Sequence, residues 1–252
     1  MWTQREAIEV FHLLFLRAFG GRVDKHLYAL KGGCNLRFFL KSVRYSEDMD
    51  LDVHKMAAGT LRNNVERVLE APAFVQALRA QQIELIQFSA PKQTATVQRW
   101  KLSLKTGGAA AAIPTKIEFS RRSLDADRTP EPVDADIINR YRLYPVVVQH
   151  YSVAAAFSQK VRALALRSEI QARDVFDLKL LLDSGAGKTP LPKESRTRLT
   201  TAIENSMTVG YDAFAGQVLA YLEPEYQSHY RQKKVWDALQ AQVIEALGGL
   251  QS

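Results

Sequence analysis

Three aspartates alternate with apolar residues in one short stretch of this chain. In the segment SEDMDLDV, residues 46–53, single apolar residues separate Asp48, Asp50 and Asp52. The two-residue period predicts a strand with one buried face, so the three carboxylates share the other face. Like charges this close repel one another. A divalent metal ion between them relieves that repulsion, and carboxylate oxygens are ligands that Mg²⁺ prefers.

Two kinds of structure besides a metal-binding strand place acids at this spacing. Charges on a solvated edge strand discourage aggregation, and this alternative stays open. A calcium loop of the EF-hand type begins with the same alternation, but it needs Gly at its sixth position and Glu at its twelfth. This chain has Val53 and Gly59 there, which excludes such a loop.

A pair of glycines lies upstream of the aspartates. Gly32 and Gly33 stand in LKGGCNLRFFLK, residues 30–41, ahead of a predicted short helix. Adjacent glycines let the backbone approach a ligand closely, and the N–H groups at a helix start attract anions. Two glycines alone usually mark only a turn. Their position before an acidic strand makes them a candidate phosphate site.

Basic residues crowd the same part of the chain, at Lys31, Arg37, Lys41 and Arg44. They fit either a solvated surface or contacts to the phosphates of an RNA substrate. The net charge of +7 also favours a polyanionic partner.

A third carboxylate is predicted on a later strand. Glu118 alternates with Ile117 and Phe119 in TKIEF, and it is the one acid in the strand region that follows residue 90. Glu84, between Ile83 and Leu85, is the competitor. Either residue also fits the exposed face of an ordinary strand.

The elements that must position these groups follow from periodicity and from breaks at Gly and Pro. An α+β fold is expected, a mixed sheet with flanking helices followed by a helical half, with domains at residues 1–145 and 146–252. Residues 123–136, rich in Asp and Pro, are expected to form an exposed loop. Helices are predicted over residues 4–19, 60–82 with a break near Pro72, and most of the chain after Ser152; strands are predicted over 46–53, 83–89, 96–105 and 115–119.

The composition is that of an ordinary globular protein, with 46% hydrophobic and 24% charged residues among 252. No apolar run reaches the roughly 18 residues that span a bilayer, so no membrane partner is expected. Cys34 is the only cysteine, which excludes an intrachain disulfide and a cysteine-based zinc cluster. A reducing, cytoplasmic location is the expectation.

Taken in order, these motifs resemble those of the DNA polymerase beta superfamily of nucleotidyltransferases. Its pattern is a hydrophobic–Gly–Gly/Ser turn, then D-h-[DE]-h on a strand, then a third carboxylate. Gly32 and Gly33, Asp48 and Asp50, and Glu118 fill the three parts. The resemblance implies a two-metal reaction, in which Mg²⁺ (or Mn²⁺) is held by the three carboxylates while the glycine turn holds the triphosphate of an NTP.

The motifs LKGGCNLR, RYSEDMDLDV and QKVRAL…RDVFDL together are similar to those of the AbiEii/AbiGii nucleotidyltransferase toxins, over about residues 26–182. This resemblance implies a toxin encoded beside an antitoxin protein, with nucleotides transferred to the 3′ end of tRNA. It also implies that a helical second half completes the active cleft with Lys160 and Asp174. Ser46 and Arg44 are then candidate nucleotide or phosphate contacts.

Several assignments stay open at this level. The pair Asp50–Asp52 also satisfies the strand motif, although Ser46 favours Asp48–Asp50, and the role of Asp52 is undefined. Cys34 stands where Ser or Thr often follows the glycines. Lys160 also fits a lysine that snorkels from an apolar helix face, and Asp174 also fits a partner of the helix dipole. Asp177 lies one helical turn beyond Asp174. Alternative functions are nucleotidylation of a protein or small molecule, and non-catalytic binding of RNA or nucleotide.

Overall fold

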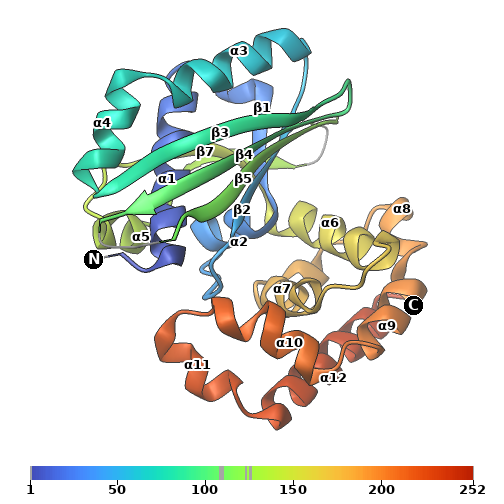
Figure 1. The fold of residues 1–252 in the computed structure, drawn as a ribbon. Helices are drawn as coiled ribbons and strands as arrows, with labels where there is room; N and C mark the ends of the chain where they lie inside the picture. The colour runs from blue at the N-terminus through green and yellow to red at the C-terminus, as the bar shows by residue number, and fades with distance from the viewer. Residues whose placement is uncertain (1, 108–110, 123, 125–126, 252) are drawn as a thin grey trace. The chain divides into compact units, whose positions relative to one another are not determined.

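The computed structural model describes residues 2–107, 111–122, 124 and 127–251, and it divides into two compact units (Figure 1). The first unit is Met1–Lys41 with Tyr45–Tyr151, and the second is Ser42–Arg44 with Ser152–Ser252. The division after Tyr151 falls later than residue 145, because a strand over Val147–Tyr151 still pairs within the sheet of the first unit.

One mixed sheet of seven strands organises the first unit, in the order β3-β4-β5-β2-β1-β7-β6. The central strand β2 runs antiparallel to β1 and parallel to β5. The expected mixed sheet is therefore confirmed. The strand bounds are β1 Tyr28–Lys31, β2 Asp48–Val53, β3 Ile83–Gln93, β4 Val97–Thr106, β5 Ile113–Arg121, β6 Arg128–Pro132 and β7 Val147–Tyr151.

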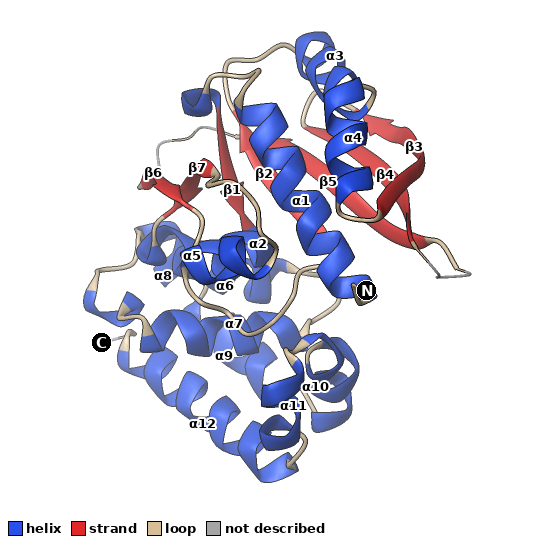
Figure 2. Cartoon of the chain, turned by 90° about the vertical axis from the view of Figure 1, so that its left-hand side faces the viewer, coloured by secondary structure: helices blue, strands red, loops and turns tan. Residues whose placement is uncertain are grey.

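Helices cover one face of this sheet, and their apolar side chains form the core with that face. A capping box between Thr3 and Glu6 begins the first of them. Met49 and Leu51 of β2 enter the core, so the acidic residues that alternate with them occupy the opposite face. Figure 2 shows α1, α3 and α4 in front of the strands. The helix bounds are α1 Gln4–Gly20, α2 Gly32–Phe39, α3 Ala58–Leu69, α4 Pro72–Ala80 and α5 Ala135–Arg140, with a 3₁₀ turn η1 at Lys25–Leu27.

The predicted break near Pro72 is confirmed, because this proline begins α4. The expectation of a loop over residues 123–136 is wrong for part of that range. Strand β6 pairs with β7 at the edge of the sheet and contains Pro130 and Pro132. Proline is tolerated on an edge strand, where an N–H group can point away from the ladder. Residues 123, 125 and 126 lie outside the described residues.

The second unit is helical, as expected, and α7 lies among α6, α10 and α12. Phe214 stacks on Trp236 at 4.5 Å between ring centroids in its core. Among the described residues, no helix is long and apolar enough to cross a membrane. The elements of the second unit are α6 Val153–Leu166, α7 Ala172–Asp183, η2 Ala186–Lys188, α8 Lys193–Arg196, α9 Leu199–Met207, α10 Tyr211–Gln217, η3 Leu219–Tyr221, α11 Pro224–Tyr230 and α12 Lys233–Gly249.

A short segment that precedes β2 in sequence belongs to this helical unit. Arg44 forms a β-bridge with Leu222, and Glu223 donates its backbone N–H to the carbonyl of Val43 at 2.9 Å. The chain therefore enters the helical unit at Ser42 and leaves it at Arg44, just before the acidic strand.

Candidate active site

Strand pairing brings Glu118 beside the aspartates and leaves Glu84 away from them. Asp50 on β2 is the registered partner of Glu118 on β5, and these side chains point to the same face. Glu84 lies on β3, which β4 and β5 separate from β2. It pairs with Lys105 and lines a pocket of about 450 Å³ at the open end of the β3–β4 hairpin, where β3 begins and β4 ends. The geometry favours Glu118 as the third carboxylate.

Three of the four neighbouring acids have a cationic partner. Asp48 Oδ2 lies 2.7 Å from Lys116 Nζ, and Glu118 Oε2 lies 2.5 Å from Arg99 Nε. The buried Asp52 pairs with Lys31 and accepts a hydrogen bond from the hydroxyl of Tyr151 at 2.9 Å. This gives Asp52 a structural partner on each side.

Asp50 is the exception among these acids. Within the described residues its carboxylate has no hydrogen bond and no ion pair. Burial raises its pKa; Lys31 opposes this effect, while Asp48 and Glu118 raise the pKa further. The ionised form of Asp50 is thus held in an unfavourable field.

Gly32 lies directly against Asp50. Its φ of +65° is in the left-handed region, and a Cβ built on it would lie 3.1 Å from Asp50 Oδ2. Glycine is therefore required here both by the backbone conformation and by the close approach. Gly32 and Gly33 begin α2, whose N-cap residue Lys31 makes no side-chain capping bond. The first N–H groups of α2 are thus placed beside Asp50, where an anion can accept from them.

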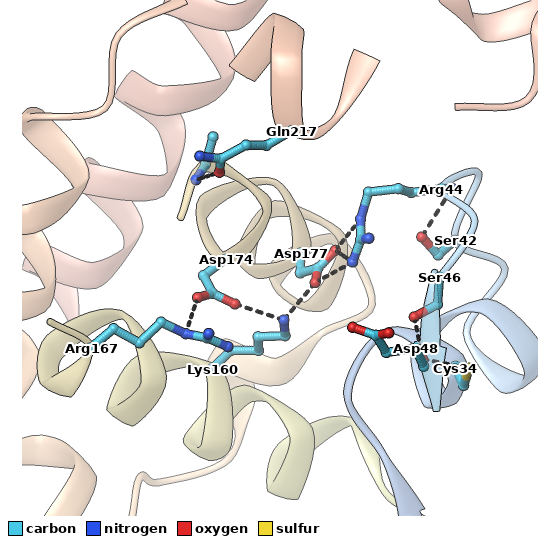
Figure 3. A network of polar contacts seen from close by, with 11 residues as sticks. Cys34, Ser42, Arg44, Ser46, Asp48, Lys160, Arg167, Asp174, Asp177 and Gln217 are labelled. Carbon is cyan, nitrogen blue, oxygen red and sulfur yellow. Dashed lines mark hydrogen bonds and ion pairs between the residues drawn. The ribbon is translucent and has the colours of Figure 1, made fainter. Parts of the chain in front are cut away.

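The backbone of Asp48 is held by two side chains, which Figure 3 shows next to it. Ser46 Oγ donates to the carbonyl of Asp48 at 2.8 Å, and Cys34 Sγ donates to the same oxygen at 3.3 Å. Cys34 is buried, and burial followed by the nearby carboxylates raises the pKa of its thiol. The thiol therefore supports the acidic strand from the core side of α2.

The chemical character of these residues fits a hard divalent cation. Carboxylate oxygens are its preferred ligands, and Asp50, beside Asp48 and Glu118, has no ion-pair partner among the described residues. In the part of the chain that is described, no three His, Cys, Asp or Glu side chains converge as a metal cluster. The side chains of Lys116 and Arg99 are 34% and 33% exposed, so they can turn away and release Asp48 and Glu118.

Lys160 and Asp174 meet in the helical unit, in a buried network drawn in Figure 3. Lys160 Nζ lies 2.8 Å from Asp174 and 2.6 Å from Asp177, and both carboxylates are fully buried. Arg44 binds Asp177 through Nε and Nη2 at 2.9–3.2 Å. Arg167 Nε lies 2.8 Å from Asp174 Oδ2, an ion pair without hydrogen-bond geometry.

The charges of this network stabilise one another. Burial alone would lower the pKa of Lys160, but Asp174 and Asp177 raise it above its usual value. Burial would also raise the pKa of Asp177, but Arg44 and Lys160 lower it. Both groups are therefore charged at neutral pH, and removing either carboxylate would leave an excess of buried positive charge.

The four cations near the glycine turn do not form one exposed cluster. Lys31 pairs with Asp52, and the buried Arg37 pairs with Glu9 at 2.7 Å. Arg44 belongs to the buried network, whereas Lys41 is 78% exposed and lies 3.9 Å from Asp134.

Sequence reasoning missed two cations that pair with the candidate site, Lys116 and Arg99. Lys116 stands two residues before Glu118, so alternation places both side chains on one face of β5. Only strand order shows that Asp48 lies opposite Lys116.

Two solved structures share the fold of this chain. JHP933 from Helicobacter pylori has a TM-score of 0.59 at 18% identity, with 99% of this chain and 95% of that chain covered. A "putative nucleotidyltransferase" from H. pylori has a TM-score of 0.60 at 16% identity, with both chains covered completely. At these identities the likeness concerns the fold.

The family follows from the sequence match. The family model for the nucleotidyl transferase AbiEii toxin of type IV toxin–antitoxin systems matches residues 14–245, and the protein belongs to this family. The resemblance inferred from the motifs is thereby confirmed. A search of curated proteins gave no match.

Proposed function

We propose that this protein is an Mg²⁺-dependent (or Mn²⁺-dependent) nucleotidyltransferase that adds NMP from an NTP to the 3′ end of an RNA, with tRNA as the acceptor. The observation that carries the proposal is the position of Asp50. Its carboxylate, which has no ion pair or hydrogen bond within the described residues, lies beside Asp48 and Glu118 and against Gly32, at the start of a helix. This arrangement supports a site for positive charge next to a site for phosphate.

The carboxylates of Asp48, Asp50 and Glu118 would hold the metal, which when bound neutralises phosphate charge and favours ionisation of the acceptor hydroxyl. The N–H groups that begin α2 bind the triphosphate, and Ser46 fixes the backbone of Asp48. The acceptor oxygen bonds to the α-phosphorus, the bond to the bridging oxygen breaks, and pyrophosphate leaves. Glu118 takes the proton of the acceptor hydroxyl.

For the helical unit we propose that Lys160 contacts phosphate and that Asp174 orients it, as the family resemblance implies. Their distance of 2.8 Å supports the orienting role. Arg44 is better explained as an anchor, since its guanidinium is bound to the buried Asp177. Membership of a type IV toxin–antitoxin family supports an antitoxin protein as the cellular partner.

The test incubates the purified protein with Mg²⁺, total tRNA and each α-labelled NTP in turn, beside Asp48→Ala. We expect a labelled, lengthened tRNA that is absent with the variant, whose fold is checked by circular dichroism. Label on protein in place of tRNA would overturn the acceptor. Absence of pyrophosphate release with every NTP would overturn the enzymatic activity itself.

A further inference from the structure

We propose that the RNA acceptor lies across strands β5, β4 and β3, on the sheet face that carries the carboxylates, and is held there by its phosphates. This face, the charged face, presents four cations: Lys116, Arg99, Lys101 and Lys92. The inference rests on the proposed function, because the acceptor must reach Asp50 and Glu118. It adds the surface that binds the body of the acceptor.

Strand register places these cations in two rows that lead away from the acids. The first row runs from Asp48 to Lys116 to Lys101, and the second from Glu118 to Arg99 to Lys92. Registered partners share one face of a sheet. With strands about 4.8 Å apart, Lys92 lies roughly 10 Å from Glu118. Positive charge therefore continues from the candidate site to the edge of the sheet.

The cations face one another directly. Lys101 is the registered partner of Lys116, and Lys92 is the registered partner of Arg99. Like charges placed opposite on neighbouring strands destabilise a sheet, so two such pairs cost folding stability. A polyanion lying along both rows would remove that cost.

Two members of the rows are available to a ligand as the structure stands. Lys92 and Lys101 are exposed and make no ion pair within the described residues. Lys116 and Arg99 are held by Asp48 and Glu118 and become available when those acids bind a metal ion. Metal loading would therefore strengthen the attraction of this face for phosphate.

Protection of the sheet edge does not explain the pattern. Lysine on an edge strand discourages pairing with other chains, which would account for Lys92 on β3. Lys101 and Lys116 lie on the interior strands β4 and β5, where no edge needs protection. An extended polyanion explains all four cations, and a single-stranded RNA end is the polyanion that the proposed reaction uses.

The test measures binding of fluorescein-labelled unfractionated tRNA by anisotropy, with Mg²⁺, at several salt concentrations. The variant is Lys92→Gln with Lys101→Gln, both outside the catalytic machinery. The matched control is Arg22→Gln with Arg67→Gln, which removes two exposed charges by α1 and on α3, at the helix-covered face. Pyrophosphate release from NTP with saturating tRNA is measured for each protein.

Two lost phosphate contacts should reduce the slope of log Kd against log salt by about 1.4–1.8 and weaken binding about tenfold, while the control stays at the wild-type value. Equal binding by both variants, or no tRNA binding by the wild type, would overturn this surface. Pyrophosphate release separates the two ideas, because it persists if only the surface is wrong and is absent if the proposed function is wrong.

Discussion

A Cβ on residue 32 would lie 3.1 Å from Oδ2 of Asp50, so Gly32 packs against Asp50 more closely than a residue with a side chain ordinarily could. Gly32→Ala would force that carboxylate to move and would place alanine at a φ of +65°. We expect a stability loss of about 1–2 kcal/mol from the left-handed conformation. We also expect at least a tenfold loss of nucleotidyl transfer, measured with labelled NTP and tRNA.

Gly59→Ala is the matched control for this substitution. Gly59 lies in α3, and no heavy atom lies within 4 Å of the position that its Cβ would occupy. Alanine is the better helix former, so stability should stay equal or rise by up to about 1 kcal/mol. Activity of Gly32→Ala at the wild-type level would show that the approach to Asp50 is not needed.

Removal of the charge on Asp50 should stabilise the protein while abolishing transfer. Burial is the main cause of its raised pKa, so ionisation of Asp50 lowers the stability of the folded state. This loss of stability is fully present above the folded pKa and is absent well below 3.8. Asp50→Asn should therefore raise the melting temperature by a few degrees at pH 7, about 2–4 °C per kcal/mol in a chain of this size. This gain should vanish as the pH falls below 3.8.

Thermal melting with and without Mg²⁺ extends this comparison without relying on activity. A bound ion stabilises the folded state. We therefore expect about 10 mM Mg²⁺ to raise the melting temperature of the wild type and not that of Asp50→Asn. Lys55→Met, an exposed charge change near the end of β2, is the control. A destabilised Asp50→Asn would contradict the unfavourable field inferred at this residue.

The network around Asp177 predicts a pH-dependent loss of helical-unit stability. Arg44 and Lys160 outweigh burial and lower the pKa of Asp177, so its contribution is complete above 3.8 and is lost as the pH falls through the folded pKa. Asp177→Asn should cost about 3–5 kcal/mol at pH 7 because it removes the buried carboxylate that Arg44 and Lys160 both bind. Hydrogen exchange of α7 measures this loss.

Asp183→Asn gives the comparison on the same helix. Asp183 pairs with Lys179 at 59% exposure, and exposed pairs contribute about 0–1 kcal/mol. Exchange in α7 should therefore stay near the wild-type rate. An equally small effect of Asp177→Asn would show that the buried network contributes little to the helical unit.

The sequence determined the local features of the candidate site. Alternation placed Asp48, Asp50 and Asp52 on one face of a strand, because successive side chains on a strand point to opposite sides. The adjacent glycines indicated a tight turn into a helix, since glycine alone adopts positive φ without strain. The helical second half followed from its periodicity in the same way.

The tertiary structure decided which distant residues meet. Strand order made Glu118, and not Glu84, the neighbour of Asp50, and it brought Lys116 to Asp48. It also made the proline-containing β6 an edge strand and gave Arg44 to the helical unit. Periodicity reports only the direction of each side chain from its own backbone. The partner across a sheet depends on how the whole core packs, which no short stretch of sequence contains.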